Sequence, residues 1–132
     1  MSFSLGKRSL ANLKGVHPDL IRVVEEAIFV TEIDFVVTCG MRTLAEQEVL
    51  FKAGASRTMK SRHLTGHAID LAPISPVDGK VSWAWPFFYH LNAAMKVAAK
   101  AVKVPLEWGG DCWLPDFQDG PHFQLPRKQY PK

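Results

Sequence analysis

Two histidines and one aspartate, His63, Asp70 and His122, have the types and surroundings of a metal site. His63 falls in a polar loop, whereas Asp70 and His122 fall in short segments that are predicted to be strands. Two imidazoles and one carboxylate suit zinc, with a fourth position open for water. Bound zinc lowers the pKa of that water to about 7 and polarises a carbonyl group. Spacing alone leaves scattered surface residues as an equal alternative.

A hydrolytic zinc site also needs a carboxylate that acts as general base and general acid. Asp119 is the first candidate, because it stands three residues before His122. Glu107 is the rival base. It precedes Trp108 in a short extended segment, but it lacks the fixed spacing to His122.

A helical zinc-protease motif on His63 and His67 is the less favourable interpretation. The residue after His63 is Leu64 rather than the glutamate that would serve as base. Gly66 weakens any helix in this segment, which then runs directly into a strand. We therefore expect His67 to lie outside the ligand set.

Helices and strands alternate irregularly around these residues, which favours an α+β fold with a small, mainly antiparallel sheet and flanking helices. Helices are predicted to begin at Pro18, to run over 44–53 behind a capping box, and to run over 86–102. Strands are predicted over 35–38, 68–72, 106–108 and 122–125, with 80–83 returning from a turn at 78–79. Residues 55–66 are predicted to be a loop.

The composition is that of one globular domain. The chain has 132 residues, of which 47% are hydrophobic and 22% are charged. The net charge of +3 is unevenly placed, with a basic stretch over 52–62 and an acidic stretch over 107–119. A solvated loop is favoured over a polyanion site for the basic stretch. Cys39 and Cys112 are predicted to be free thiols rather than a disulfide or metal ligands.

The sequence resembles a known family at the residues singled out above. SRHLTGHAID over 61–70 and DGPH over 119–122 match the pattern S-x-H-x-x-G-x-A-x-D followed by [ED]-x-x-H. This pattern is typical of the zinc D-Ala-D-Ala carboxypeptidase and dipeptidase family, whose phage branch contains the L-alanyl-D-glutamate endopeptidase endolysins. CGMRT over 39–43 with Gln47, and EWGG over 107–110, resemble further segments of that family.

The resemblance implies a role for each matching residue and a hedgehog/D-Ala-D-Ala-peptidase-like fold. His63, Asp70 and His122 match the ligands of one Zn²⁺ ion, and Asp119 matches the catalytic carboxylate. Arg42 matches the arginine that binds the substrate carbonyl and stabilises the oxyanion.

The resemblance also implies a substrate side of the site. Ser61 and Gln47 match motif positions, and Trp108 or Trp113 is expected to line the cleft. The bacterial dipeptidase branch usually has glutamate at the base position, whereas this chain has Asp119. Aspartate occurs in the endolysin-like branch, which favours an endopeptidase.

These observations predict a single catalytic domain over 1–132, without a separate wall-binding domain, that acts as a phage endolysin. The expected substrate is the stem peptide of peptidoglycan, cut at the L-Ala–D-Glu bond. We expect a monomer without nucleic-acid binding or stable membrane insertion. No signal peptide is evident, so we expect synthesis in the host cytoplasm, export with a holin-like partner, and action on the cell wall in the periplasm.

Two other functions fit the same residues. The first is a D,D-carboxypeptidase or dipeptidase that trims terminal D-alanine. The second is a non-catalytic metal-binding or envelope-binding module on the same fold. Peptidoglycan fragments separate the first from the endopeptidase, and substitution of Asp119 tests the second.

Overall fold

The computed structural model describes residues 3–56, 58–111 and 119–131. Four short strands form its sheet: β1 (Phe35–Cys39), β2 (Ala68–Pro73), β3 (Glu107–Trp108) and β4 (His122–Gln124). The strand order is β1-β2-β4-β3, and each neighbouring pair is antiparallel. The α+β fold with a small antiparallel sheet is therefore confirmed.

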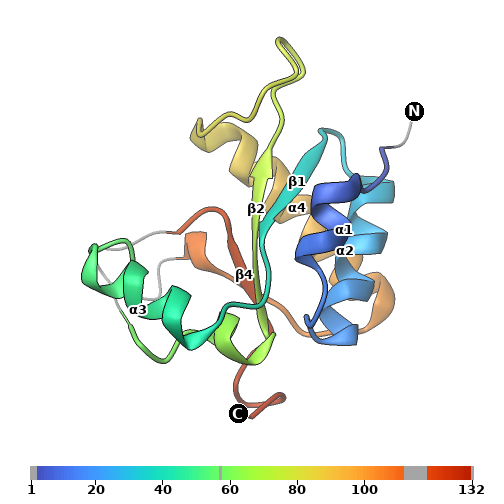
Figure 1. Cartoon of the computed structure of the whole chain (residues 1–132). Helices are drawn as coiled ribbons and strands as arrows, with labels where there is room; N and C mark the ends of the chain where they lie inside the picture. The colour runs from blue at the N-terminus through green and yellow to red at the C-terminus, as the bar shows by residue number, and fades with distance from the viewer. Residues whose placement is uncertain (1–2, 57, 112–118, 132) are drawn as a thin grey trace.

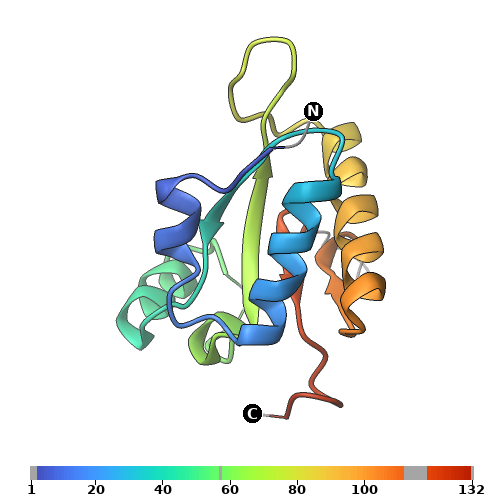
Figure 2. The ribbon, with the colours of Figure 1, turned by 90° about the vertical axis from the view of Figure 1, so that its right-hand side faces the viewer.

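Helices α2 (Pro18–Val30) and α4 (Trp85–Val102) cover one face of the sheet (Figures 1 and 2). Helix α1 (Lys7–Asn12) lies along the outer edge of β1, where Ser9 and Asn12 hydrogen-bond to the backbone of Val37. Helix α3 (Leu44–Lys52) lies on the opposite side, with the short 3₁₀ helix η1 (Arg62–Thr65) nearby. A second 3₁₀ helix, η2 (Gly109–Asp111), follows β3.

The hydrophobic core lies between the sheet and the covering helices. Strand β2 contributes Ile69 and Leu71, and β4 contributes Phe123, all with no exposed surface. Successive side chains of a strand point to opposite faces. Asp70 and His122 therefore stand on the face that turns away from the core, because they alternate with these buried residues.

The strand register brings three polar side chains level across this outer face. Asp70 in β2 pairs directly with His122 in β4 and with Cys39 in β1. The register of β1 shifts between Val37 and Cys39, so Thr38 is an extra residue on that strand. Such a bulge re-aims the residue that follows it, and it places Cys39 opposite Asp70.

Local sequence signals account for most of the elements. Helix α2 begins at Pro18, as predicted, and the predicted capping box of α3 is present, with Thr43 accepting from Glu46 N and Glu46 accepting from Thr43 N. Helix α4 begins at Trp85, one residue before the predicted start.

Three elements differ from the prediction. The return over 80–83 is only an isolated bridge between Ile74 and Val81, and α1 has no strong signal in the sequence. The segment predicted to be a loop over 55–66 contains the 3₁₀ helix η1. No helix in the described ranges is both long enough and apolar enough to cross a membrane.

Candidate metal and catalytic site

Strands β2 and β4 fix two of the three predicted metal ligands. Asp70 and His122 are Cα partners across the antiparallel pair, with their flanking residues buried in the core. Directly opposed side chains on one face of such a pair have Cβ atoms roughly 4.5–5.5 Å apart. The sheet therefore holds the Asp70 carboxylate beside the His122 imidazole.

The third predicted ligand, His63, comes from η1, which precedes β2. The Ser61 hydroxyl caps this helix by accepting a hydrogen bond from His63 N at 3.2 Å. Gly66 ends it in the left-handed region with φ 76°, and a Cβ there would come within 2.4 Å of the Gly15 carbonyl oxygen. Only glycine meets both conditions. The spacing S-x-H-x-x-G is thus a capped turn that presents His63 to the outer face.

Both histidines converge on one carboxylate oxygen. His63 Nε2 and His122 Nδ1 each lie 3.3 Å from Asp70 Oδ1. The two imidazole rings have centroids 5.0 Å apart and meet edge to face. His63 Nε2 and Asp70 Oδ1 are buried and have no hydrogen-bond partner in the described parts of the chain. Buried polar atoms without partners are costly, and a metal ion coordinated by these atoms would satisfy them.

A backbone carbonyl sets the orientation of the His63 ring. Its Nδ1 lies 2.8 Å from the Gly40 carbonyl oxygen. A carbonyl only accepts, so Nδ1 carries a proton in either charge state of the ring, and Nε2 is the nitrogen that can offer a lone pair to a metal ion. Metal-binding histidines are usually oriented in this way by their second nitrogen.

A side-chain relay orients the His122 ring. Gln124 Nε2 donates to Glu107 Oε1 at 3.0 Å, and Gln124 Oε1 lies 2.9 Å from His122 Nε2. The Glu107 carboxylate fixes the orientation of the Gln124 amide, because a carboxylate only accepts. The amide oxygen therefore accepts from His122 Nε2, and His122 Nδ1 is the nitrogen left to face Asp70 and to bind a metal ion. Glu107, the rival base, lies behind this relay.

Cys39 also stands close to the three predicted ligands. Ligand atoms of Cys39, His63 and Asp70 all lie within 4.8 Å of one another, so these three residues could hold a metal ion. The thiol sulfur is 3.8 Å from His63 Nδ1, which is the nitrogen already directed at Gly40. Cys39 therefore lies beside the imidazole edge that turns away from Asp70. The other cysteine, Cys112, lies outside the described residues.

Asp119 enters the site from a turn that its own backbone helps to close. Its N–H donates to the Gly109 carbonyl at 3.0 Å, and its carbonyl accepts from His122 N at 3.2 Å. The indole N–H of Trp108 donates to the Gly120 carbonyl at 2.7 Å. Trp108 is thus buried and braces this turn, although it was predicted to line the cleft. The other tryptophan predicted there, Trp113, lies outside the described residues.

Arg42 completes the group from the start of α3. Its Nη1 donates to Gln47 Oε1 at 2.8 Å, and its Nη2 lies 3.4 Å from Asp70 Oδ2. Gln47 is fully buried and also donates to the Ser56 hydroxyl at 2.7 Å and to the Thr58 carbonyl at 2.6 Å. Gln47 was predicted to bind substrate. It lies behind Arg42, outside the cleft lining, and its side chain holds the Arg42 guanidinium in place.

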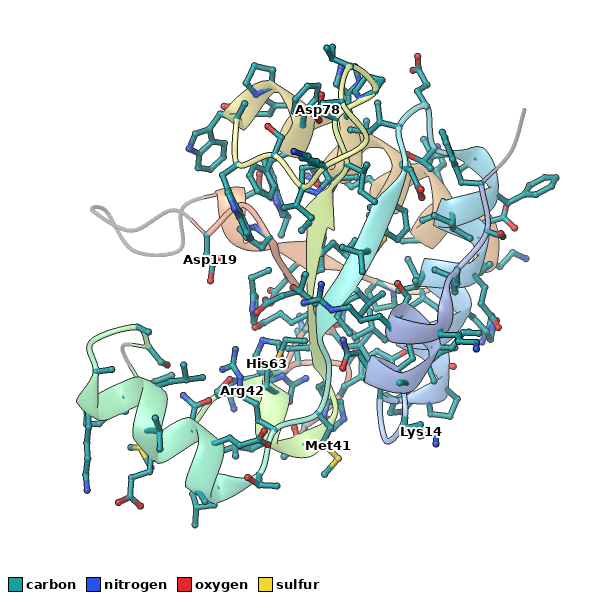
Figure 3. All side chains as sticks on the ribbon, turned by 45° about the horizontal axis from the view of Figure 1, so that its top comes forward. Lys14, Met41, Arg42, His63, Asp78 and Asp119 are labelled. Atoms are coloured by element: carbon teal, nitrogen blue, oxygen red, sulfur yellow. The ribbon has the colours of Figure 1, made fainter. Side chains whose placement is uncertain are left out.

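These side chains surround a cleft of about 410 Å³. This volume suits a small peptide segment. Figure 3 shows Asp119 on one side, its carboxylate directed toward the side on which Arg42 and His63 lie. The cleft is lined by the three predicted ligands, by Asp119 and Arg42, and by Ser61, Gln124, Arg127 and residues of the 55–62 segment. Gln47, Trp108 and Glu107 do not line it.

The electrostatics of the site favour the ionised form of Asp70 and disfavour the ionised form of Asp119. Burial raises the pKa of Asp70, but the adjacent His122 and His63 outweigh it and hold that pKa well below its usual range. Burial lowers the pKa of His63, yet the Asp70 carboxylate outweighs this and raises it to about 9. Burial, followed by the Asp70 charge, raises the pKa of Asp119. A raised pKa suits a carboxyl group that must accept and return a proton.

One residue of the basic stretch behaves differently from the prediction. Arg62 is buried rather than solvated, and its Nη2 donates to the carbonyls of Leu125 at 2.7 Å and Tyr130 at 2.8 Å. It ties the loop that carries His63 to the segment that follows β4. Its neighbour Lys60 is exposed, as predicted.

The family model of the phage L-alanyl-D-glutamate peptidase matches residues 1–125. The chain belongs to this family. It is 35% identical over 115 residues to the L-alanyl-D-glutamate peptidase of Escherichia phage T5, covering 84% of this chain and 82% of that protein. It is 34% identical over 127 residues to the L-alanyl-D-glutamate peptidase of Listeria phage A118, covering 93% of this chain and 42% of that protein.

A solved structure extends the comparison to the fold. The crystal structure of the Serratia marcescens L-Ala D-Glu endopeptidase ChiX superposes with a TM-score of 0.86 and 42% sequence identity. The alignment covers 96% of this chain and 92% of that chain. The family resemblance drawn from the SRHLTGHAID and DGPH segments is therefore confirmed.

Proposed function

We propose that this protein is a zinc endopeptidase that hydrolyses the bond between L-alanine and D-glutamate in the stem peptides of peptidoglycan, in the service of phage lysis. The observation that carries the proposal is the convergence of His63 Nε2 and His122 Nδ1 on Asp70 Oδ1 at the floor of a cleft that Asp119 also lines. Membership in the phage L-alanyl-D-glutamate peptidase family supports the choice of the L-Ala–D-Glu bond as the one that is cut.

In this proposal His63, Asp70 and His122 hold one zinc ion. Their two nitrogens and one oxygen are the donor set of a catalytic zinc site, and two of these atoms are otherwise unsatisfied. When bound, zinc acts as a Lewis acid and makes water a better nucleophile at neutral pH. The relays through Gly40 and through Gln124 keep both imidazole lone pairs directed at the same point.

Asp119 and Arg42 perform the proton transfer and the charge stabilisation in this proposal. Asp119 accepts a proton from the attacking water as the new C–O bond forms. It then gives that proton to the D-glutamate nitrogen as the C–N bond breaks, so the amine leaves uncharged. Arg42, oriented by Gln47, directs a guanidinium at the carbonyl oxygen while negative charge develops there. Ser61 holds the η1 turn through its hydrogen bond with His63.

The test is digestion of purified peptidoglycan, with and without a chelator, with the products identified by mass and by N-terminal analysis. The proposal predicts new N-terminal D-glutamate that the chelator abolishes and added zinc restores. Release of D-alanine instead would identify a D,D-carboxypeptidase or dipeptidase. Absence of any cleavage by zinc-loaded protein would leave a binding module.

The conservative variant Asp119→Asn separates catalysis from metal binding. We expect it to bind zinc as the unchanged protein does, because Asp119 is not a proposed ligand. Its rate should fall by about 10²- to 10⁴-fold, the usual contribution of general acid–base catalysis. Lys128→Met, a change at an exposed residue outside the cleft, is the matched control.

A further inference from the structure

The cleft carries more positive charge than its chemistry requires. Four cationic residues line it, namely Arg42, Lys60, Arg62 and Arg127. The acidic residues in its lining are Asp70 and Asp119, which the proposed function already uses. Two of the cations are also committed, because Arg42 is held by Gln47 and Asp70 and Arg62 is buried against backbone carbonyls. Lys60 and Arg127 remain.

Lys60 and Arg127 form one cationic rim at the side of the cleft. Both side chains are exposed, and neither has an acidic partner within the ranges that the structure describes. Arg127 Nη2 donates to the Lys60 carbonyl at 3.0 Å, which fastens the segment after β4 to the loop before η1. The bond holds the Arg127 guanidinium against the backbone of Lys60, so two cationic residues from distant chain segments line the same part of the cleft.

The proposed substrate offers a matching negative charge. The nitrogen of the D-glutamate residue belongs to the bond that is cut, and only one of its two carboxyl groups can continue the peptide. The other carboxyl group stays free, and it is ionised at neutral pH. It lies within one residue of the scissile bond, a span of roughly 3.5 Å. Exposed cations on the wall of the same cleft would attract a carboxylate held so close to the metal site.

We propose that Lys60 and Arg127 form a carboxylate-recognition subsite that selects D-glutamate residues whose second carboxyl group is free. This inference rests on the proposed function for the identity of the substrate. An amidated D-glutamate keeps the same shape and loses the charge, so it should bind less tightly. The rim is then a specificity determinant that leaves the chemical step unchanged.

The test compares two synthetic peptides that contain the acyl-L-Ala-D-Glu unit and differ only in that second carboxyl group, free in one and amidated in the other. Equilibrium binding is measured on the zinc-loaded Asp119→Asn variant, in which cleavage is expected to be about 10²- to 10⁴-fold slower. Exposed ion pairs contribute up to about fivefold in affinity each. We therefore expect the free carboxylate to bind up to about 25-fold more tightly than the amide when both cations are present.

The variants assign this preference to the two side chains. Lys60→Met and Arg127→Met should each lower affinity for the carboxylate peptide by about fivefold and leave affinity for the amide unchanged. The double variant should not distinguish the peptides. Arg127→Lys, which keeps the charge, should keep most of the preference. The matched control Lys128→Met changes a neighbouring exposed cation outside the cleft and should keep all of it.

The binding measurements test the recognition subsite, and the cleavage measurements test the proposed peptidase activity. A double variant that still prefers the carboxylate would overturn the inference, and so would an equal loss in Lys128→Met, which would indicate general charge attraction. In the cleaving protein, the same variants should raise KM for the carboxylate peptide and leave kcat unchanged. Preferential binding without any cleavage would refute the proposed function and leave the recognition subsite standing.

Discussion

The hydrogen-bond relay from His122 through Gln124 to Glu107 makes a sharp prediction about metal affinity. Replacing Gln124 with leucine removes the acceptor that holds His122 Nε2 at 2.9 Å and the donor that reaches Glu107 at 3.0 Å. The imidazole can then rotate or take the other tautomer, in which Nδ1 carries the proton and cannot bind a metal.

The expected magnitude follows from what the relay does. Loss of a group that orients a metal-binding histidine typically lowers metal affinity by about 10- to 100-fold. This corresponds to about 1.4–2.7 kcal/mol. Gln124 and Glu107 are both partly exposed, so water can replace the lost hydrogen bonds in the metal-free protein. Its free energy of unfolding should therefore change by only about 1 kcal/mol.

The assay is zinc binding in competition with a chromophoric chelator, paired with urea unfolding of the metal-free protein. Gln129→Leu is the matched control, because Gln129 is an exposed glutamine outside the cleft. Glu107→Ala should give a smaller loss, since Gln124 stays in place but its amide is free to turn over. Unchanged zinc affinity in Gln124→Leu, with the fold intact, would refute the reasoning and leave His122 oriented by other contacts.

Three other predictions follow from contacts at the site. Gln47→Met should lower kcat/KM by about tenfold at unchanged zinc affinity, because Arg42 loses the acceptor that orients it, and Gln47→Glu should restore part of that loss. Arg62→Met should lower the free energy of unfolding in urea by about 3 kcal/mol, because two backbone carbonyls lose a charged donor.

The third concerns His63, whose pKa of about 9 in the metal-free protein means that zinc binding at pH 7 displaces about one proton. The apparent affinity of the protein for zinc should then rise about tenfold per pH unit up to about pH 9. Calorimetry in two buffers measures the number of protons released on binding. In the metal-free protein, the stability linked to this raised pKa is present below about pH 6.5 and is lost as the pH rises through about 9.

Patterns local in the sequence were sufficient to predict much of this site. Thr43 and Glu46 form the predicted capping box, and Ser61 caps the η1 turn that Gly66 closes. The alternation of Asp70 with buried neighbours places it on a strand face. The structure then gathers all the predicted ligands into one cleft with Asp119 and Arg42, while their roles in binding and catalysis stay predictions.

Features that depend on contacts between distant segments could not be predicted in the same way. Arg62 looked like one more charge in a solvated loop, because its two carbonyl partners lie more than 60 residues away. Gln47 matched a motif position, but only the fold reveals that it is buried. The bulge at Thr38 carries no clear sequence signal, since it arises from how β1 meets β2. The pattern of a single sequence indicates which face of a strand or helix is buried. It does not indicate which distant residue a side chain contacts on that face.

The arrangement assigns different tasks to the sheet and to the loops. Asp70 and His122 lie on strands whose other face is packed into the core, so their separation cannot change without disturbing Ile69 and Phe123. The proposed recognition cations, Lys60 and Arg127, lie on segments outside the sheet and are joined by a single hydrogen bond. Substitutions there would alter the preference for a peptide without disturbing the metal site. We therefore expect selectivity for the D-glutamate carboxylate to be separable from catalysis in this fold.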